Sequence, residues 1–234
     1  MKLFLNTLLC IVFIGISSIE GFAQRTHSVK DIFYLLPDSV FTNIHQLNFA
    51  KKDSFPITER YKMIENFDVK RKKFIPNDPR FHVLLLNEKN NLLSASNGDL
   101  NFDVKLWTVS PTESLIAVDG YYKEDMYSQT LKFYTYKGGK ISPVKVFPEQ
   151  FPLKLFFEPT YIEKQGLDPN LPMPDVFVVF SKTGGEELQA RIQKESFDEE
   201  LIGSKAPLAR LSYIRVKRPD VILNLQSGKF AITK

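Results

Sequence analysis

Short apolar runs separated by turn signals fill the chain from about residue 70 onward, and this rhythm constrains the fold more than any other feature. The clearest turn signal is Lys137-Gly138-Gly139-Lys140, because two adjacent glycines reach positive φ at no steric cost. Residues 131–136 alternate in character before it, and residues 141–147 are the expected returning strand. Runs this short, joined this tightly, predict antiparallel hairpins rather than parallel strands linked by helices.

The same pattern predicts strands on both sides of this hairpin. Residues 81–86 are expected to turn at Asn90-Asn91 and to return as residues 92–96, and residues 97–99 form a further turn signal. Residues 115–118 are uniformly apolar, so we expect this strand to be covered on both faces, with Asp119-Gly120 turning or bulging the chain after it. The remaining segments of this kind are residues 102–109, 175–180, 187–194, 221–225 and 229–232, of which 187–194 is also compatible with a helix.

The N-terminal part has helical rather than strand character. Ser28 and Asp31 have the spacing of a capping box, and Ile32, Leu35 and Leu36 follow at helical intervals until Pro37. A second helix is expected from Asp38-Ser39, with Val40, Ile44 and Leu47 on one face, and a third from Thr58, with Tyr61, Ile64 and Phe67 on one face. The predicted class is therefore α+β: short helices within residues 24–69, then a mainly antiparallel sheet of successive hairpins within residues 70–234, with 24–234 forming one globular unit.

Residues 1–23 are typical of an export signal. Lys2 supplies the positive start, an apolar run covers residues 8–19, and Gly21-Phe22-Ala23 places small residues where a signal peptidase cuts. Cleavage after Ala23 would leave a protein that begins at Gln24, in the periplasm or secreted, with no stable membrane span. A retained N-terminal anchor is the alternative.

The cysteine content and the net charge limit which compartments and partners the protein is expected to have. Cys10 is the only cysteine and lies inside the predicted signal, so the exported protein would rely on its core rather than on disulfides. Cys10 lies too early and in the wrong context for a lipoprotein signal. The net charge of +4 is modest for a nucleic-acid-binding protein, and export argues against that partner as well.

Motifs for catalysis, cofactors and metals are missing from the sequence. There is no nucleophile elbow, zinc-protease helix, phosphate loop or dinucleotide-binding glycine pattern. The three histidines, His27, His45 and His82, are too far apart in sequence to share a turn or strand, so neither a metal nor a cofactor is predicted.

A catalytic site assembled from distant residues is the alternative, and no catalytic residue is assigned. His82 or His45 with Asp38 or Asp119 are the nearest candidates for a histidine and an acid. His82 lies in an apolar run, which favours a packed or edge-strand role. The neighbouring acids Glu186-Glu187 would point apart on a strand, which is not the arrangement that a glycosidase needs.

The tyrosines indicate a binding surface instead. Tyr122, Tyr134 and Tyr136 are expected to share a sheet face, where aromatic rings can stack on a sugar or a peptide. Ordinary cross-strand aromatic pairing is the competing interpretation.

Several short motifs resemble a family of exported proteins of unknown function from Bacteroidetes. The similarity is carried by the Ala23-Gln24 junction and by four segments in the rest of the chain: Pro37-Asp38-Ser39, Thr108-Val109-Ser110 with Glu113-Ser114, Phe133-Tyr134 and Gly228-Lys229-Phe230. The family has no assigned activity, so the resemblance implies a compartment and a phylum and transfers no catalytic residue.

Two functional interpretations follow. The first is a non-enzymatic binding or structural module of the bacterial envelope, with a glycan, a peptide or another envelope protein as partner. The alternative is a periplasmic hydrolase with a scattered catalytic site, which would require His82 or His45 to converge with an acid and a nucleophile in one pocket.

Overall fold

The computed structural model describes residues 27–42, 57–68, 73–74, 82–96, 100–122, 130–148, 150–180, 185–197 and 208–232. The predicted signal and its cleavage site, His45, and the turn at residues 97–99 lie outside these ranges. Within them, no helix is both long and apolar enough to cross a membrane.

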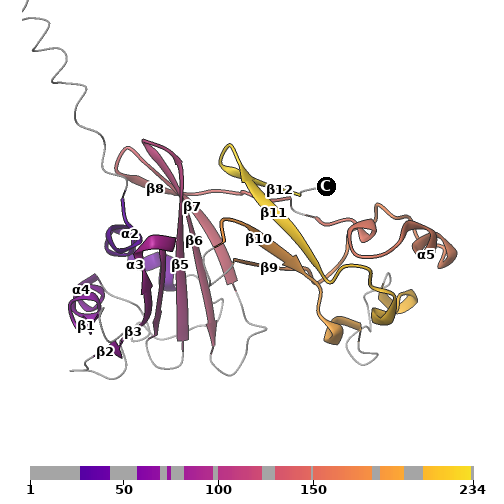
Figure 1. Cartoon of the computed structure of the whole chain (residues 1–234), viewed down its shortest axis with the longest axis horizontal. Coiled ribbons are helices and arrows are strands. Elements are labelled where there is room, and N and C mark those ends of the chain that lie inside the picture. The colour runs from indigo at the N-terminus through magenta and orange to yellow at the C-terminus, as the bar shows by residue number, and fades with distance from the viewer. Residues whose placement is uncertain are drawn as a thin grey trace, which may run out of the picture.

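A six-stranded antiparallel sheet forms the centre of the molecule (Figure 1). Its strands are β3 (His82–Asn87), β4 (Leu92–Ser96), β5 (Leu100–Ser110), β6 (Glu113–Tyr122), β7 (Thr130–Lys137) and β8 (Lys140–Pro143). The spatial order equals the chain order, so each strand pairs with the next one in sequence. The predicted succession of hairpins is confirmed.

The two-glycine turn closes the hairpin between β7 and β8 as predicted. Lys137 pairs with Lys140, and Gly138 and Gly139 have φ angles of 56° and 79°. These values match the mirror-image turns that follow the right-handed twist of paired strands. The returning strand is shorter than predicted, because β8 ends at Pro143, a residue that cannot donate a backbone hydrogen bond.

A second antiparallel sheet of four strands follows in the chain. Its order is β12 (Lys229–Ile232), β11 (Asp220–Gln226), β10 (Leu188–Arg191) and β9 (Phe177–Phe180). The segment that was compatible with either a strand or a helix is therefore a strand, β10. The predicted closing hairpin is confirmed, with Ser227 and Gly228 in its turn at φ 50° and 79°.

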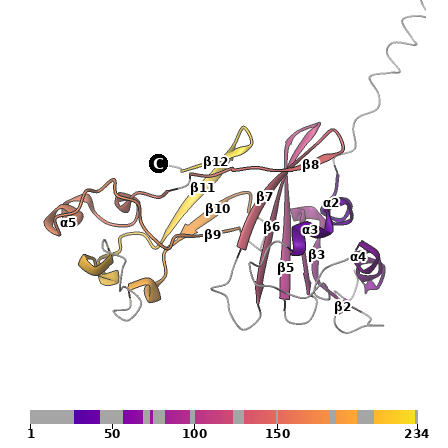
Figure 2. The same cartoon turned by 180° about the vertical axis from the view of Figure 1, so that it is seen from behind.

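The six-stranded sheet is covered on both faces. Residues 115–118 of β6 are fully buried, as their uniformly apolar character predicts. Even-numbered residues such as Ile116 face a core shared with the N-terminal helices, and odd-numbered residues such as Leu115 face a core shared with the four-stranded sheet. Figures 1 and 2 show the helices and the second sheet on opposite sides of the central sheet.

The Asp119-Gly120 prediction is wrong. Both residues lie within β6, where Asp119 pairs with Asp103 and Gly120 pairs with Phe102, with no register shift at either pair. A turn signal of this type is overridden when both neighbouring strands continue past it. The described part of the chain is accordingly mainly antiparallel β, with a few short helices.

The N-terminal helices begin where the sequence indicates. They are α2 (Val29–Leu35), α3 (Asp38–Thr42) and α4 (Ile57–Glu65). The capping box is present, since the Asp31 backbone N–H donates to Ser28 Oγ and the Ser28 N–H donates to the Asp31 carboxylate. The predicted apolar faces differ in part: Ile32 and Leu36 are buried, but Leu35 is exposed.

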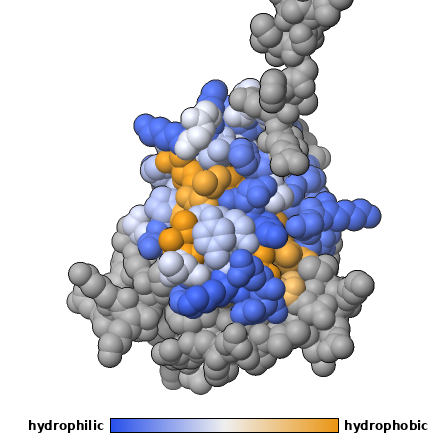
Figure 3. Space-filling model, turned by 90° about the vertical axis from the view of Figure 1, so that its left-hand side faces the viewer, coloured by the Kyte–Doolittle hydropathy of each residue, from blue (hydrophilic) through white to orange (hydrophobic). Residues whose placement is uncertain are grey.

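The helical side presents an interrupted apolar surface. Its exposed large side chains include Leu35, Ile57, Tyr61 and Leu84. Tyr61 stacks on Tyr34 with ring centroids 4.1 Å apart, rather than joining Ile64 and Phe67 in the core. Figure 3 shows the apolar groups on this side divided by hydrophilic residues.

The proline-rich segment after β8 builds a lobe at the far end of the second sheet (Figure 1). It contains the 3-10 turn η4 (Leu153–Leu155) and the helix α5 (Pro159–Lys164), which the sequence analysis did not predict. The other 3-10 turns of the described residues are η2 (Glu88–Asn90), between β3 and β4, and three later ones: η5 (Lys194–Phe197), η6 (Leu208–Arg210) and η7 (Tyr213–Arg215). The buried side chains of the lobe are Leu153, Phe156, Phe157 and Ile162. They belong to the core that the central sheet shares with the four-stranded sheet.

Candidate functional site

The pairing of β7 with β8 covers only part of β7. The last bond of this hairpin runs from the Val144 N–H to the Phe133 carbonyl, 3.0 Å. A hollow of about 390 Å³ lies where the two chains separate. We call it the β7 hollow. It is lined by Leu131, Lys132, Phe133, Tyr134, Pro143, Val144, Lys145, Val146 and Phe147.

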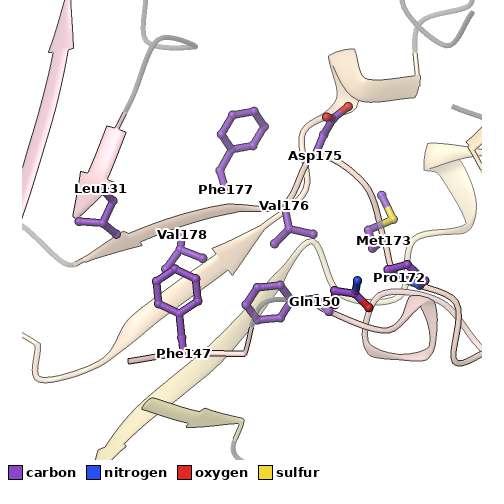
Figure 4. Close-up of a pocket in the computed structure, with 10 residues that line it drawn as sticks. Leu131, Phe147, Gln150, Pro172, Met173, Asp175, Val176, Phe177 and Val178 are labelled. Carbon is purple, nitrogen blue, oxygen red and sulfur yellow. The ribbon is translucent and has the colours of Figure 1, made fainter. Parts of the chain in front are cut away.

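A second hollow, the β9 groove, has a volume of about 380 Å³ and shares Leu131 and Phe147 with the first. Asp175 and Val176, just before β9, and Phe177 and Val178, its first two residues, line it in succession. Consecutive residues of an extended chain point to opposite faces, so the groove follows the edge at the start of β9. In Figure 4, Val176 and Val178 lie on one side of β9, with Phe147 beside Val178, while Phe177 points to the other side. The other lining residues are Gln150, Phe151, Pro172 and Met173.

β9 is an edge strand in the part of the chain that the structure describes. It pairs with β10 on one side, and no described strand pairs with its other side. Its first three residues are only partly buried. Edge strands expose backbone donors and acceptors in a row, which makes them templates for another strand.

The side chains that line the β9 groove are mostly apolar, whereas about half of the groove's surface is polar. Asp175 and Gln150 are its polar lining residues, and the backbone of Asp175 has a left-handed φ of 53°. Aspartate tolerates this conformation better than most residues, so it allows a sharp change of direction just before β9. Neither hollow includes a serine, cysteine or histidine among its described lining residues. The geometry suits binding by shape and by backbone hydrogen bonds.

The structure separates the three predicted tyrosines. Tyr134 and Tyr136 project from the same side of β7 toward the helical layer, and Tyr136 contacts His27 at 4.6 Å between ring centroids. Tyr134 also lines the β7 hollow, and burial raises the pKa of its hydroxyl. Tyr122 pairs with Leu100 at the other end of β6, about 20 Å along the strand from Ile116, which pairs with Tyr134.

His82 lies in a polar row on the opposite face of the central sheet. It pairs with Ser96, which pairs with Asn101, which pairs with Tyr121. The next row contains Ser94, Asp103 and Asp119. A register shift between Val83 and Leu85 leaves Leu84 exposed, so His82 shares its face with Leu85, one residue further along than Leu84, which strict alternation would place there.

His82 is not adjacent to either acid of the hydrolase alternative, and His45 lies outside the described residues. Three strand spacings separate β3 from β6, so the backbones at His82 and Asp119 are about 14 Å apart or more. Asp38 lies in the helical layer, on the other side of the central sheet, where it binds Arg60. Among the described residues, no group of three or more histidine, cysteine, aspartate and glutamate side chains has a geometry that could hold a metal ion.

Two buried polar features were missed by the sequence analysis. Asp103 and Asp119 pair directly across β5 and β6, with exposures of 0% and 3%. Lys105 is buried on the same face, where its Nζ donates to the Asn90 carbonyl at 2.6 Å and lies 5.7 Å from the centre of the Trp107 ring. Burial lowers the pKa of Lys105. The alternation of Asp103, Lys105 and Trp107 was the available signal, since a tryptophan on that face indicates that it is covered.

Comparison with known proteins gives one structural likeness. No protein-family model and no curated protein matches the chain. The chain is similar to the structure of a domain of an uncharacterized protein from Porphyromonas gingivalis W83, a member of the Bacteroidetes. The TM-score is 0.48 and the sequence identity is 17%, over 88% of this chain and 97% of that one.

Proposed function

We propose that this protein is a non-enzymatic binding module that takes up an extended peptide of a partner protein along the edge of β9 with which no described strand pairs. The observation that carries the proposal is the coincidence of a strand edge that no described strand covers with a groove along it, lined mainly by apolar side chains. In strand addition, backbone hydrogen bonds supply affinity and pockets for alternate side chains supply specificity. The β9 groove offers both.

The composition of β9 supports this use. Residues 176–180 read Val-Phe-Val-Val-Phe, with no charge and no proline. Proteins usually protect an edge strand with a lysine, a proline or a bulge, because an exposed apolar edge invites uncontrolled association. β9 contains no lysine, proline or bulge, although at four residues it is a short edge strand.

A peptide suits the groove better than a glycan does. Sugars are held by several side-chain donors and acceptors, whereas Gln150 and Asp175 are the only polar side chains among the described residues that line the β9 groove. Its volume of about 380 Å³ lies at the lower end of the range for small-molecule pockets and has room for two or three peptide side chains.

We infer that this binding takes place outside the cytoplasm, in the bacterial envelope. The support is the sequence of residues 1–23: Lys2, the apolar run and the small residues of Gly21-Phe22-Ala23. Expression of the full chain in a Gram-negative host, followed by intact-mass measurement, should give a protein that begins at Gln24. Recovery of an uncleaved, membrane-embedded chain would contradict export and cleavage.

A peptide-display selection tests the binding proposal. Random decapeptides enriched on the wild-type protein should favour apolar residues at alternate positions. Val178→Lys should weaken their binding by at least about tenfold, since a charge then enters the groove. Val179→Lys is the matched control, because Val179 is a partly buried valine of the same strand that does not line the groove.

Three outcomes would count against the β9 site. They are no enrichment of peptides, equal losses in both valine variants, and binding that is lost only in a combined Tyr122→Ala, Tyr134→Ala and Tyr136→Ala variant. The last result would place the ligand on the tyrosine surface proposed from the sequence. Enrichment of a glycan instead of a peptide would replace the partner class.

A further inference from the structure

Ile214, in the 3-10 turn η7, is 91% exposed, more than any other large apolar side chain of the described residues. Such exposure means that the side chain stands clear of its neighbours on a convex surface. A single exposed aliphatic residue is ordinary on a protein surface. The basic residues near Ile214 in the sequence make its exposure relevant to binding.

Basic residues flank Ile214 in the sequence. Residues 208–219 contain Arg210, Arg215, Lys217 and Arg218 and no acidic residue. All four are exposed. Lys217 forms an ion pair with Glu158 at 2.6 Å, whereas no ion pair involves the three arginines in the described structure. We call Ile214 and these four residues the basic tip.

The backbone of the basic tip is fixed to the lobe. The Ser212 N–H donates to Tyr161 Oη at 3.0 Å, and the Lys217 N–H donates to the Phe156 carbonyl at 2.8 Å. The Tyr213 ring contacts the Phe197 ring at 5.5 Å between centroids. These contacts hold η7 while leaving Ile214 outside, so its exposure is a property of the folded lobe.

We propose that the basic tip docks this protein onto an anionic lipid surface. A guanidinium binds the phosphate of a lipid headgroup, and one aliphatic side chain at a convex point can enter the boundary between headgroups and acyl chains. A protein partner is a poorer fit, because protein interfaces need a broad complementary area with aromatic anchors. The tip lies at the end of the molecule opposite α2 and α4 (Figures 1 and 2) and shares no residue with the β9 groove.

Vesicle co-sedimentation tests this proposal, with protein expressed from the full chain and its N-terminus established by intact mass. Vesicles of phosphatidylcholine with 30% phosphatidylglycerol should bind the protein, and vesicles of phosphatidylcholine alone should bind it much less. Added sodium chloride should weaken binding. Replacing Arg215 or Arg218 by Gln should lower the partition coefficient about fivefold each. Ile214→Ser should lower it by about tenfold.

Ile222→Ser is the matched control, since Ile222 is an exposed isoleucine on β11 that is not part of the basic tip. It should leave vesicle binding unchanged, and circular dichroism should show that every variant is folded. Equal binding to both kinds of vesicle would overturn the proposal. So would equal binding by all variants, which would assign membrane affinity to another part of the chain, or an equal loss in both isoleucine variants.

Discussion

Arg60 and Asp38 form an ion pair at 2.5 Å that joins α4 to α3 across 22 residues of sequence. The same guanidinium donates from Nη1 to the carbonyls of Phe33 and Leu36, where α2 ends without a basic residue of its own. Arg60 therefore caps one helix, binds a second and belongs to a third. Its side chain is 1% exposed, whereas that of Asp38 is 49% exposed.

The burial difference predicts unequal effects of mutation. Arg60→Met should lower the free energy of unfolding by about 2–4 kcal/mol, because two buried carbonyls lose their donor. Asp38→Asn should cost less than about 1 kcal/mol, since that carboxylate is half in solvent. Urea denaturation of the two variants measures both values. Equal losses of unfolding free energy in the two variants would show that the ion pair, rather than the capping of α2, stabilises the fold.

The two-glycine turn should depend on backbone conformation alone. Added Cβ atoms at Gly138 and Gly139 would meet nothing within 4 Å, so a substitution there is strained only by its positive φ. Replacing both glycines by Val should destabilise the fold by about 1–3 kcal/mol. Gly138→Asn is the control and should cost much less, because asparagine adopts left-handed φ readily. An unchanged denaturation midpoint in the double Val variant would contradict the role of this turn.

Alkaline pH should weaken the helical layer through Tyr34. Burial raises the pKa of Tyr34 to about 12, and the negative charges of Glu65, Tyr61 and Asp31 act in the same direction. A tyrosine whose pKa is raised in the folded state contributes stability that is complete below pH 10 and is lost as the pH rises toward 12. Wild type should therefore lose more stability than Tyr34→Phe between pH 10 and pH 12. Parallel stability curves for the two proteins would refute this assignment.

His82 should not support hydrolysis. Its partner across the strands is Ser96, and Asp119 lies three strands away on the same face. A general base needs its acid and nucleophile within hydrogen-bond reach. A panel of esterase and glycosidase substrates should give the same result for wild type and His82→Ala. Turnover that disappears in the variant would restore the hydrolase alternative.

Local patterns predicted those parts of the fold that depend on local physics. Apolar residues on both faces of residues 115–118 indicated a strand in the middle of a layered core, and Ser28 with Asp31 indicated the start of α2. Positive φ at Gly138 and Gly139 followed from the chemistry of glycine. Each of these features is decided within about ten residues of sequence.

Features that depend on distant strands could not be derived in this way. The bulge at Leu84 shifts a register that an uninterrupted apolar run does not reveal. Asp119-Gly120 looks like a turn until β5 and β7 are placed beside it. The helix α5 does have a local signal, since Pro159 lies in its first turn, where proline is favoured.

The candidate site was missed for the same reason. The sequence predicts residues 175–180 as a strand, but only the strand order shows that β9 is at an edge and that Leu131 and Phe147 lie beside it. The tyrosines looked favourable because they alternate on one face. Only the pairing of β6 with β7 shows that Tyr122 lies at a strand end, far along the sheet from Tyr134 at the β7 hollow and from Tyr136 beside the helical layer.

Hydrogen exchange of the β9 backbone amides, with and without a selected peptide, tests the central claim most directly. A peptide that adds to the edge of β9 must accept hydrogen bonds from outward-facing amides of Phe177–Phe180. We expect those amides to exchange at least about tenfold more slowly in the complex. Amides in the Gly138-Gly139 turn should be unaffected. Tight peptide binding with unchanged exchange throughout β9 would contradict the account.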